Sequence, residues 1–281
     1  VYPDKISVIY NGKRFTWHET FVRCKGLALA LQHAGLSSGD VVGFMATNTP
    51  ELYEAHFGVP MAGMILNALN CRLDARTIAY IIDHSQIKLL VSDKEFSTII
   101  SQAIKICNSK PIVVDIDDPY ISGGELIGHC NYEEFIALDT TNFRSLELHD
   151  EWETISVNYT SGTTGKPKGV VYHYRGAYLN ALGNALEWNM GAHPIYLWTL
   201  PMFHCNGWCF PWTIAAKVGT NVCIRKVAPD VIFDCLSEHG VTHLCGAPIV
   251  LSMMINATDA QKKHFTQKCK VMTAAAPPPA M

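Results

Sequence analysis

Residues 159–169 combine the groups that a loop needs to hold a polyphosphate. The segment reads Tyr-Thr-Ser-Gly-Thr-Thr-Gly-Lys-Pro-Lys-Gly, with three glycines, two lysines and four Thr or Ser hydroxyls. Glycines let backbone N–H groups converge on anionic oxygens, while hydroxyls donate further hydrogen bonds and lysines supply positive charge. We therefore predict a phosphate-binding loop. Its predicted ligands are Thr160, Ser161, Gly162, Thr163, Thr164, Gly165, Lys166 and Lys168.

The surroundings of this loop separate it from other nucleotide-binding patterns. It follows a strand-like run at residues 155–159 and precedes a helical pattern that we expect to begin near residue 172. A Walker loop needs a glycine five residues ahead of a Gly-Lys-Ser/Thr triplet, and neither this arrangement nor the dinucleotide-binding fingerprint occurs. The alternative is a solvated turn, but such turns seldom combine glycines, hydroxyls and lysines at this density.

A second stretch with chemical potential is residues 200–208, Leu-Pro-Met-Phe-His-Cys-Asn-Gly-Trp. It follows a predicted strand, and ligands of open α/β sheets bind at strand ends. Phe203, His204 and Trp208 could therefore wall an apolar pocket with one titratable group at its mouth. A core histidine beside packed aromatic rings explains the same residues equally well.

Composition excludes several functional classes. The chain has 281 residues, 48% of them hydrophobic and 17% charged, which is enough to bury a sizeable core in one or two domains. A formal net charge of −3 without a basic run argues against nucleic-acid binding, and no apolar run is long enough to span a membrane. The ten cysteines form no Cys-x-x-Cys pair, so we expect reduced thiols in an intracellular protein and no metal site.

Apolar strands alternate with helices along the whole chain, which predicts an α/β fold of mostly parallel sheets flanked by helices. A hairpin is expected around Asn11-Gly12. Further strands are expected at residues 41–45, 65–69, 87–91, 112–115, 155–159, 196–200, 221–225, 241–245 and 270–274. Helices are expected at residues 21–35, from 50, and at 74–83, 94–107, 172–188, 208–217, 230–238 and 248–257.

The polar, acidic segment 117–153 suggests a connection between two α/β portions, residues 1–153 and 154–281. The second portion stops in mid-pattern at Pro-Pro-Pro-Ala-Met, so we expect it to be incomplete.

These motifs resemble those of the adenylate-forming enzymes, the family of acyl-CoA synthetases, luciferases and peptide-synthetase adenylation domains. Residues 159–169 are similar to the family's phosphate loop, and residues 200–208 to the motif whose histidine lines the carboxylate and adenylate site. Residues 273–277 resemble the small-residue loop that packs against adenine, although alanine stands where the family normally has glycine. The sequences of these motifs look most similar to those of plant acyl-activating enzymes for short- or medium-chain fatty acids and benzoate- or cinnamate-like acids. The resemblance thus assigns His204 and Lys168 to catalysis, and Ala274, Ala275, Ala276 and Pro277 to adenine binding.

The resemblance implies a two-step reaction. A small carboxylic acid attacks the α-phosphorus of ATP to give an acyl adenylate and pyrophosphate, and the thiol of coenzyme A then displaces AMP. Positioning and charge neutralisation are the main demands of such a step, and Mg²⁺ is expected to bridge the phosphates. Lys168 is the expected fixed charge, whereas Lys166 could equally face solvent.

Parts of the family pattern have no match in residues 1–281: the aromatic-Gly-x-Thr-Glu string, the ribose-binding aspartate and the C-terminal lid domain with its lysine. We therefore expect an acid–CoA ligase whose isolated chain is catalytically crippled. The alternatives are a non-catalytic truncated isoform or regulatory nucleotide-binding module, and an adenylate-forming enzyme with an acceptor other than coenzyme A. Location is expected to be cytoplasmic or peroxisomal, because a peroxisomal signal would lie at the C-terminus.

Overall fold

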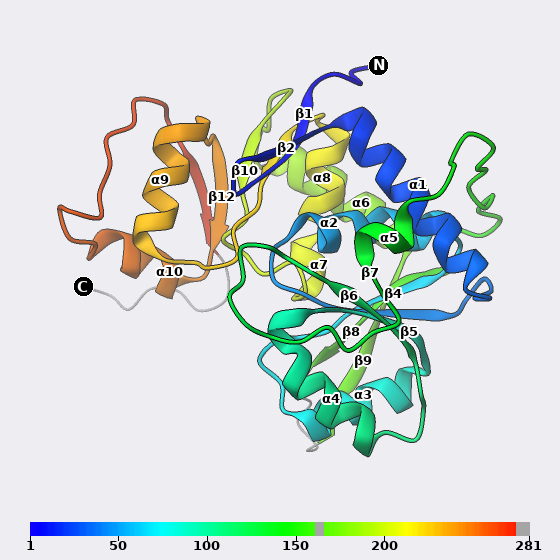
Figure 1. The fold of residues 1–281 in the computed structure, drawn as a ribbon. Coiled ribbons are helices and arrows are strands. Elements are labelled where there is room, and N and C mark those ends of the chain that lie inside the picture. Colours follow the sequence, from blue (N-terminus) through cyan, green and yellow to red (C-terminus); the bar gives the residue numbers. More distant parts are fainter. Residues whose placement is uncertain (161–165, 274–281) are drawn as a thin grey trace.

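The computed structural model describes residues 1–160 and 166–273, which form two sheets flanked by helices (Figure 1). The six-stranded sheet contains, in spatial order, β13 (Lys270–Thr273), β12 (His243–Gly246), β10 (Ile195–Leu197), β11 (Thr220–Val222), β1 (Ile6–Tyr10) and β2 (Lys13–Thr16). The seven-stranded sheet contains β7 (Cys130–Asn131), β6 (Ile112–Ile116), β5 (Ile87–Asp93), β3 (Val41–Met45), β4 (Ile65–Ala68), β8 (Thr154–Thr160) and β9 (Lys168–His173).

All strand pairs in the described residues are parallel except β1–β2 and β8–β9. The predicted fold class is therefore confirmed. Each sheet draws strands from both sides of residue 153, because β1 and β2 join the six-stranded sheet while β8 and β9 join the other. The hairpin at Asn11-Gly12 is confirmed too, and both turn residues have positive φ, 44° and 83°.

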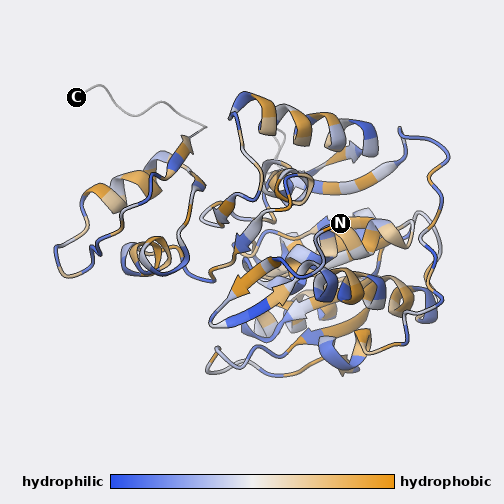
Figure 2. Cartoon of the chain, turned by 90° about the horizontal axis from the view of Figure 1, so that it is seen from above, coloured by the Kyte–Doolittle hydropathy of each residue, from blue (hydrophilic) through white to orange (hydrophobic). Residues whose placement is uncertain are grey.

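The helices follow the strands in the expected alternation. They are α1 (Trp17–His33), α2 (Pro50–Met61), α3 (Ala75–Ser85), the 3₁₀ turn η1 (Lys94–Phe96), α4 (Ser97–Ile106), α5 (Tyr132–Ile136), α6 (Tyr174–Glu187), α7 (Cys205–Trp208), α8 (Phe210–Ala216), α9 (Pro229–His239) and α10 (Pro248–Ile255). Figure 2 shows hydrophobic and hydrophilic residues alternating around helices, as expected where one face is buried. No helix of residues 1–160 or 166–273 is long and apolar enough to cross a membrane.

One continuous core joins the two sheets, and helix α2 lies within it. Leu52, Tyr53 and Val59 of α2 are completely buried, in the same cluster as Phe44 of β3 and Tyr196 of β10. Helices α3 and α4 cover the far face of the seven-stranded sheet, and α9 and α10 pack against the six-stranded one (Figure 1).

One part of the predicted element order is wrong. Residues 168–173 form strand β9, antiparallel to β8, and helix α6 begins only at Tyr174. The physical reason is the β-branched pair Val170-Val171, which favours an extended backbone. The predicted phosphate loop therefore connects the two strands of a hairpin, and it does not lead directly into a helix.

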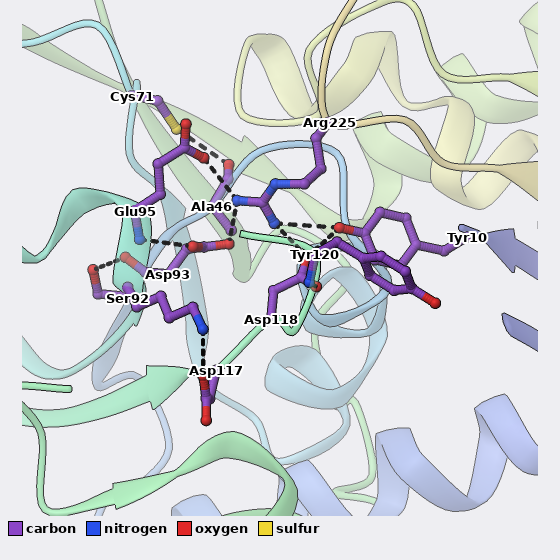
Figure 3. A network of polar contacts seen from close by, with 11 residues as sticks. Tyr10, Ala46, Cys71, Ser92, Asp93, Glu95, Asp117, Asp118, Tyr120 and Arg225 are labelled. Carbon is purple, nitrogen blue, oxygen red and sulfur yellow. Dashed lines mark hydrogen bonds and ion pairs between the residues drawn. The ribbon is translucent and has the colours of Figure 1, made fainter. Parts of the chain in front are cut away.

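An ion-pair network also holds the two sheets together (Figure 3). Arg225 follows β11, and its guanidinium Nη2 lies 2.7 Å from both Asp93 Oδ2 and Glu95 Oε2, while Nη1 lies 2.6 Å from Asp118 Oδ2. Asp93 ends β5 and Asp118 follows β6, both strands of the seven-stranded sheet. Tyr10 of β1 donates a hydrogen bond to Asp118. The side chains of Asp93 and Asp118 are 0% and 4% exposed, so the arginine balances charge that water barely reaches.

Candidate functional site

The hairpin of β8 and β9 sets the direction of the predicted phosphate-binding residues. Thr160 lies directly opposite Lys168, and Asn158 directly opposite Val170. Because residues two apart in a strand share a face, these four side chains belong to one face of the hairpin. Thr160 and Lys168 are both exposed, at the end of the ladder where the turn begins. Lys166 is exposed as well, in the turn itself.

This face of the hairpin borders a cavity of about 130 Å³. An adjoining depression of about 370 Å³ shares six of its lining residues and adds Thr77 and Pro167. The cavity lies where β4 and β8 end, as ligand sites of parallel sheets do. Its lining residues are Asn67, Ala68, Leu69, Asn70, Leu73, Ile81, Asn158, Tyr159, Thr160, Val170, Tyr172, Phe203, His204 and Cys205. The structure thus brings Thr160 and His204 to one cavity although they lie far apart in the sequence.

Three buried asparagines hold the segment that carries His204. Asn48 donates hydrogen bonds of 2.8 and 3.0 Å to the carbonyls of Trp198 and Leu200, and its Oδ1 accepts one of 2.8 Å from the Met202 N–H. Two further bonds fasten the segment to β8: Asn158 Nδ2 to the Phe203 carbonyl at 3.2 Å, and Asn206 Nδ2 to Ser156 Oγ at 2.7 Å. These bonds fasten the segment, which follows β10 of the six-stranded sheet, to the seven-stranded sheet, and so fix the position of the exposed His204.

The chain directly after His204 adopts an unusual conformation. Residues 205–209 all have positive φ, between 50° and 65°, and only Gly207 among them lacks a side chain. Such a left-handed run costs about 1–2 kcal/mol for each L-residue and persists only where surrounding contacts hold it. The helix predicted over residues 208–217 is therefore wrong at its start, because α8 begins only at Phe210.

His204 and Cys205 perturb each other's ionisation. Cys205 Sγ lies 3.8 Å from Nδ1 and 3.9 Å from Nε2 of His204. Interaction with Cys205 raises the pKa of His204, and interaction with His204 lowers the pKa of the Cys205 thiol. Burial raises the pKa of the neighbouring Tyr172. Each group therefore stabilises the charged form of the other.

Two polar residues of the cavity were missed in the sequence. Asn67 and Asn158 are 1% and 5% exposed, and the Oδ1 atom of each has no hydrogen-bond partner among residues 1–160 and 166–273. Their Nδ2 atoms donate hydrogen bonds: Asn67 to Ser85 Oγ at 3.1 Å and Asn158 to the Phe203 carbonyl at 3.2 Å. A buried acceptor without a partner costs about 1–3 kcal/mol, so both oxygens suit a ligand that donates hydrogen bonds. The available signal was an asparagine within each apolar strand.

The remaining predicted site residues have different outcomes. Ser161, Gly162, Thr163, Thr164, Gly165, Ala274, Ala275, Ala276 and Pro277 fall outside the described residues. Phe203 lines the cavity, but the ring of Trp208 packs against the hydrophobic core. Within the described ranges, no group of three or more His, Cys, Asp and Glu side chains is arranged to hold a metal ion.

Comparison with known proteins decides the family. A family model described as AMP-binding enzyme matches residues 1–281. The chain belongs to this family. The resemblance drawn from residues 159–169 and 200–208 is thereby confirmed.

The similar sequences include plant acid–CoA ligases. An acetate/butyrate–CoA ligase of Arabidopsis thaliana, named peroxisomal, is 42% identical over 100% of this chain and 52% of that protein. A 2-methylpropanoate–CoA ligase of Humulus lupulus is 43% identical over 99% of this chain and 51% of the relative. A trans-cinnamate:CoA ligase of Petunia hybrida, named peroxisomal, is 42% identical over 99% of this chain and 51% of the relative. The predicted likeness to plant acyl-activating enzymes is confirmed, and the chain spans about half the length of these relatives.

Solved structures agree on the fold. The N-terminal domain of FACL13 from Mycobacterium tuberculosis has a TM-score of 0.85 at 20% identity, with 99% of this chain and 68% of that chain covered. The o-succinylbenzoate CoA synthetase of Bacillus subtilis, in complex with its acyl-adenylate intermediate, has a TM-score of 0.81 at 21% identity. The match covers 99% of this chain and 67% of that chain.

Proposed function

We propose that this chain is part of an ATP-dependent acid–CoA ligase that activates a small carboxylic acid through an acyl adenylate. The observation that carries the proposal is the convergence of Thr160 and His204 on one cavity at the strand ends, where Thr160 lies directly opposite Lys168. Family membership and the names of the relatives support the same reaction.

In this proposal the β- and γ-phosphates of ATP lie at the turn of the β8–β9 hairpin. The Thr160 hydroxyl donates a hydrogen bond to the phosphates, and Lys168, directly opposite, supplies a fixed positive charge. That charge stabilises the pyrophosphate as negative charge moves towards it. Lys166 adds positive charge near the phosphates, but it lies outside strand β9.

His204 receives the carboxylate of the acid substrate. Its raised pKa favours the imidazolium form, which attracts the carboxylate and later the adenylate. Because three asparagines hold its segment, the ring stays in position while the carboxylate oxygen approaches the α-phosphorus.

Mg²⁺ would supply charge neutralisation on the phosphates, and coenzyme A would supply the accepting thiol. The Oδ1 atoms of Asn67 and Asn158, which have no hydrogen-bond partner among residues 1–160 and 166–273, suit an N–H donor of a bound ligand.

The relatives' names favour short aliphatic acids, such as acetate, butyrate and 2-methylpropanoate, over cinnamate-like acids as substrates. The word peroxisomal in two of these names favours a peroxisomal over a cytoplasmic location.

Acid-dependent exchange between ATP and pyrophosphate tests the proposal. The enzyme should be the longest natural product that contains residues 1–281, assayed with acetate, butyrate, 2-methylpropanoate, benzoate and cinnamate. We expect exchange with at least one short acid, and Lys168→Ala should lower its rate roughly 10²-fold because a charge facing the transition state is lost.

Lys166→Ala is the matched control, since it removes the same charge from the same turn. We expect a smaller loss, because Lys166 lies outside strand β9. Exchange that continues without any acid, or that is indifferent to Lys168→Ala, would contradict the proposed role of the hairpin.

A further inference from the structure

Cys205 differs from every other cysteine of the chain. Burial raises the pKa of the nine others, which are Cys24, Cys71, Cys107, Cys130, Cys209, Cys223, Cys235, Cys245 and Cys269. The pKa of Cys205 is lowered, chiefly by its contact with His204. A thiolate, and not a thiol, is the nucleophile in cysteine chemistry.

The position of Cys205 makes this thiol accessible to small molecules. It is half-buried and lines the cavity together with His204, Asn158 and Tyr172. Its backbone has φ of 50°, at the start of the left-handed run that Asn206 fastens to β8. The thiol is therefore fixed towards the cavity.

The cavity also offers acceptors for a small hydrogen-bond donor. Asn158 and Asn67, which are 5% and 1% exposed, both line it, and the buried Oδ1 atom of each has no partner in the part of the chain that the structure describes. Hydrogen peroxide has two O–H donors and fits in a cavity of about 130 Å³.

We propose that Cys205 is a redox-active thiol of this cavity, which hydrogen peroxide oxidises to a sulfenic acid. The thiolate sulfur attacks one peroxide oxygen, an S–O bond forms, and the O–O bond breaks. Hydroxide leaves and takes a proton from solvent, so the sulfur loses two electrons and the peroxide is reduced. Oxidation changes the sulfur that contacts His204 and adds an oxygen to the cavity that Thr160 also lines.

Groups on every neighbouring element set the pH dependence of this reaction. His204 lowers the pKa of Cys205, and so does Tyr172 of β9, while Arg72 lowers the pKa of His204. Cys209, four residues on, has its own pKa raised by burial first and by Cys205 second. His204 is the largest influence, so its removal should have the largest effect.

Trapping with dimedone tests the proposal. The chain is treated with one equivalent of hydrogen peroxide at pH 7, and adducts are mapped on peptides by mass spectrometry. We expect the adduct at Cys205 to form about tenfold faster than at Cys71, Cys130 or Cys269, the other half-buried cysteines. Cys205→Ser should abolish it, and Cys269→Ser should leave it unchanged.

The dependence on His204 separates activation from mere exposure. His204→Gln keeps a polar side chain at an exposed position, so folding should be retained, which circular dichroism can check. We expect this variant to react several-fold more slowly at pH 7, with its rate rising towards the wild-type rate at higher pH as the thiol ionises. Equal rates at Cys205 and Cys269, or a pH profile that His204→Gln does not move, would overturn the proposal.

Discussion

The Arg225→Met variant should lose about 3–5 kcal/mol of unfolding free energy at pH 7, the usual effect of removing one partner from a buried ion pair. Without the guanidinium, Asp93 and Asp118 would remain buried at 0% and 4% exposure without a counter-charge. The network joins the segment after β11 to the ends of β5 and β6, so the loss should loosen the contact between the two sheets (Figure 3). Urea denaturation measures the effect.

The pH dependence of this loss gives a second readout. In the wild type, burial already raises the pKa of Asp93 against the opposing effect of Arg225. For Asp118 burial also raises the pKa, but hydrogen bonds from Tyr10 and the Tyr120 N–H, together with Arg225, outweigh it and the pKa is lowered.

Removing Arg225 raises the folded-state pKa of Asp93 further above its unfolded value, and it takes away part of the lowering at Asp118. A carboxyl with a raised folded-state pKa stabilises the fold below the unfolded pKa and loses that contribution as the pH rises through the folded pKa. The variant should therefore recover part of its deficit as the pH is lowered from 7 to 5.

Lys226→Ala is the matched control for charge, because Lys226 is the next residue and is exposed. We expect it to change the unfolding free energy by less than about 0.5 kcal/mol, as exposed substitutions usually do. Adding Asp93→Asn to Arg225→Met should restore part of the loss, since it removes one of the uncompensated charges. Equal stability of Arg225→Met and Lys226→Ala would show that the network does not hold the sheets together.

The local sequence pattern predicted individual helices and strands well where the intrinsic preference of the residues agrees with the way they pack. The apolar run 41–45 forms β3 with the predicted bounds, and Asp74 caps α3 with hydrogen bonds of 2.9 and 3.1 Å from Arg76 N–H and Thr77 N–H. What the pattern could not reveal is which strands pair. β1 lies beside β11 and not beside β3, and the Asn221 side chain bonds to the Ser7 carbonyl across 214 residues. Such contacts depend on tertiary packing, not on local periodicity.

The candidate site was predicted in part for the same reason. The spacing of glycines, hydroxyls and lysines predicted a phosphate-binding loop at residues 159–169 but not the hairpin that contains it, and the aromatic context singled out His204, which lines the cavity. Asn67 and Asn158 were missed because their significance comes from facing the same cavity, from strands that only the sheet brings together. The left-handed conformation of residues 205–209 was also unpredictable, because four of its five members are not glycine. The Asn206–Ser156 bond and the packing around Trp198 hold it.

Gly207→Ala should disturb this segment more than any other change of one methyl group near the site. A Cβ at Gly207 would lie 2.5 Å from Cζ3 and 2.9 Å from Cη2 of Trp198. The indole cannot easily move, because it is completely buried, its Nε1 donates to Asn221 Oδ1 at 3.0 Å, and it packs edge-on against Tyr196. With φ of 54°, the backbone also disfavours any side chain.

Together the two effects should lower the unfolding free energy by about 2–4 kcal/mol, from overpacking and the left-handed backbone. Gly183→Ala is the matched control: Gly183 lies inside α6, and its added Cβ would meet nothing within 4 Å. That variant should gain about 0.5–1 kcal/mol, since alanine restricts the unfolded chain and favours a helix. Urea denaturation compares the two variants. If both shift stability in the same direction, the left-handed turn is not held against Trp198, and the fixed placement of His204 and Cys205 at the cavity would need another cause.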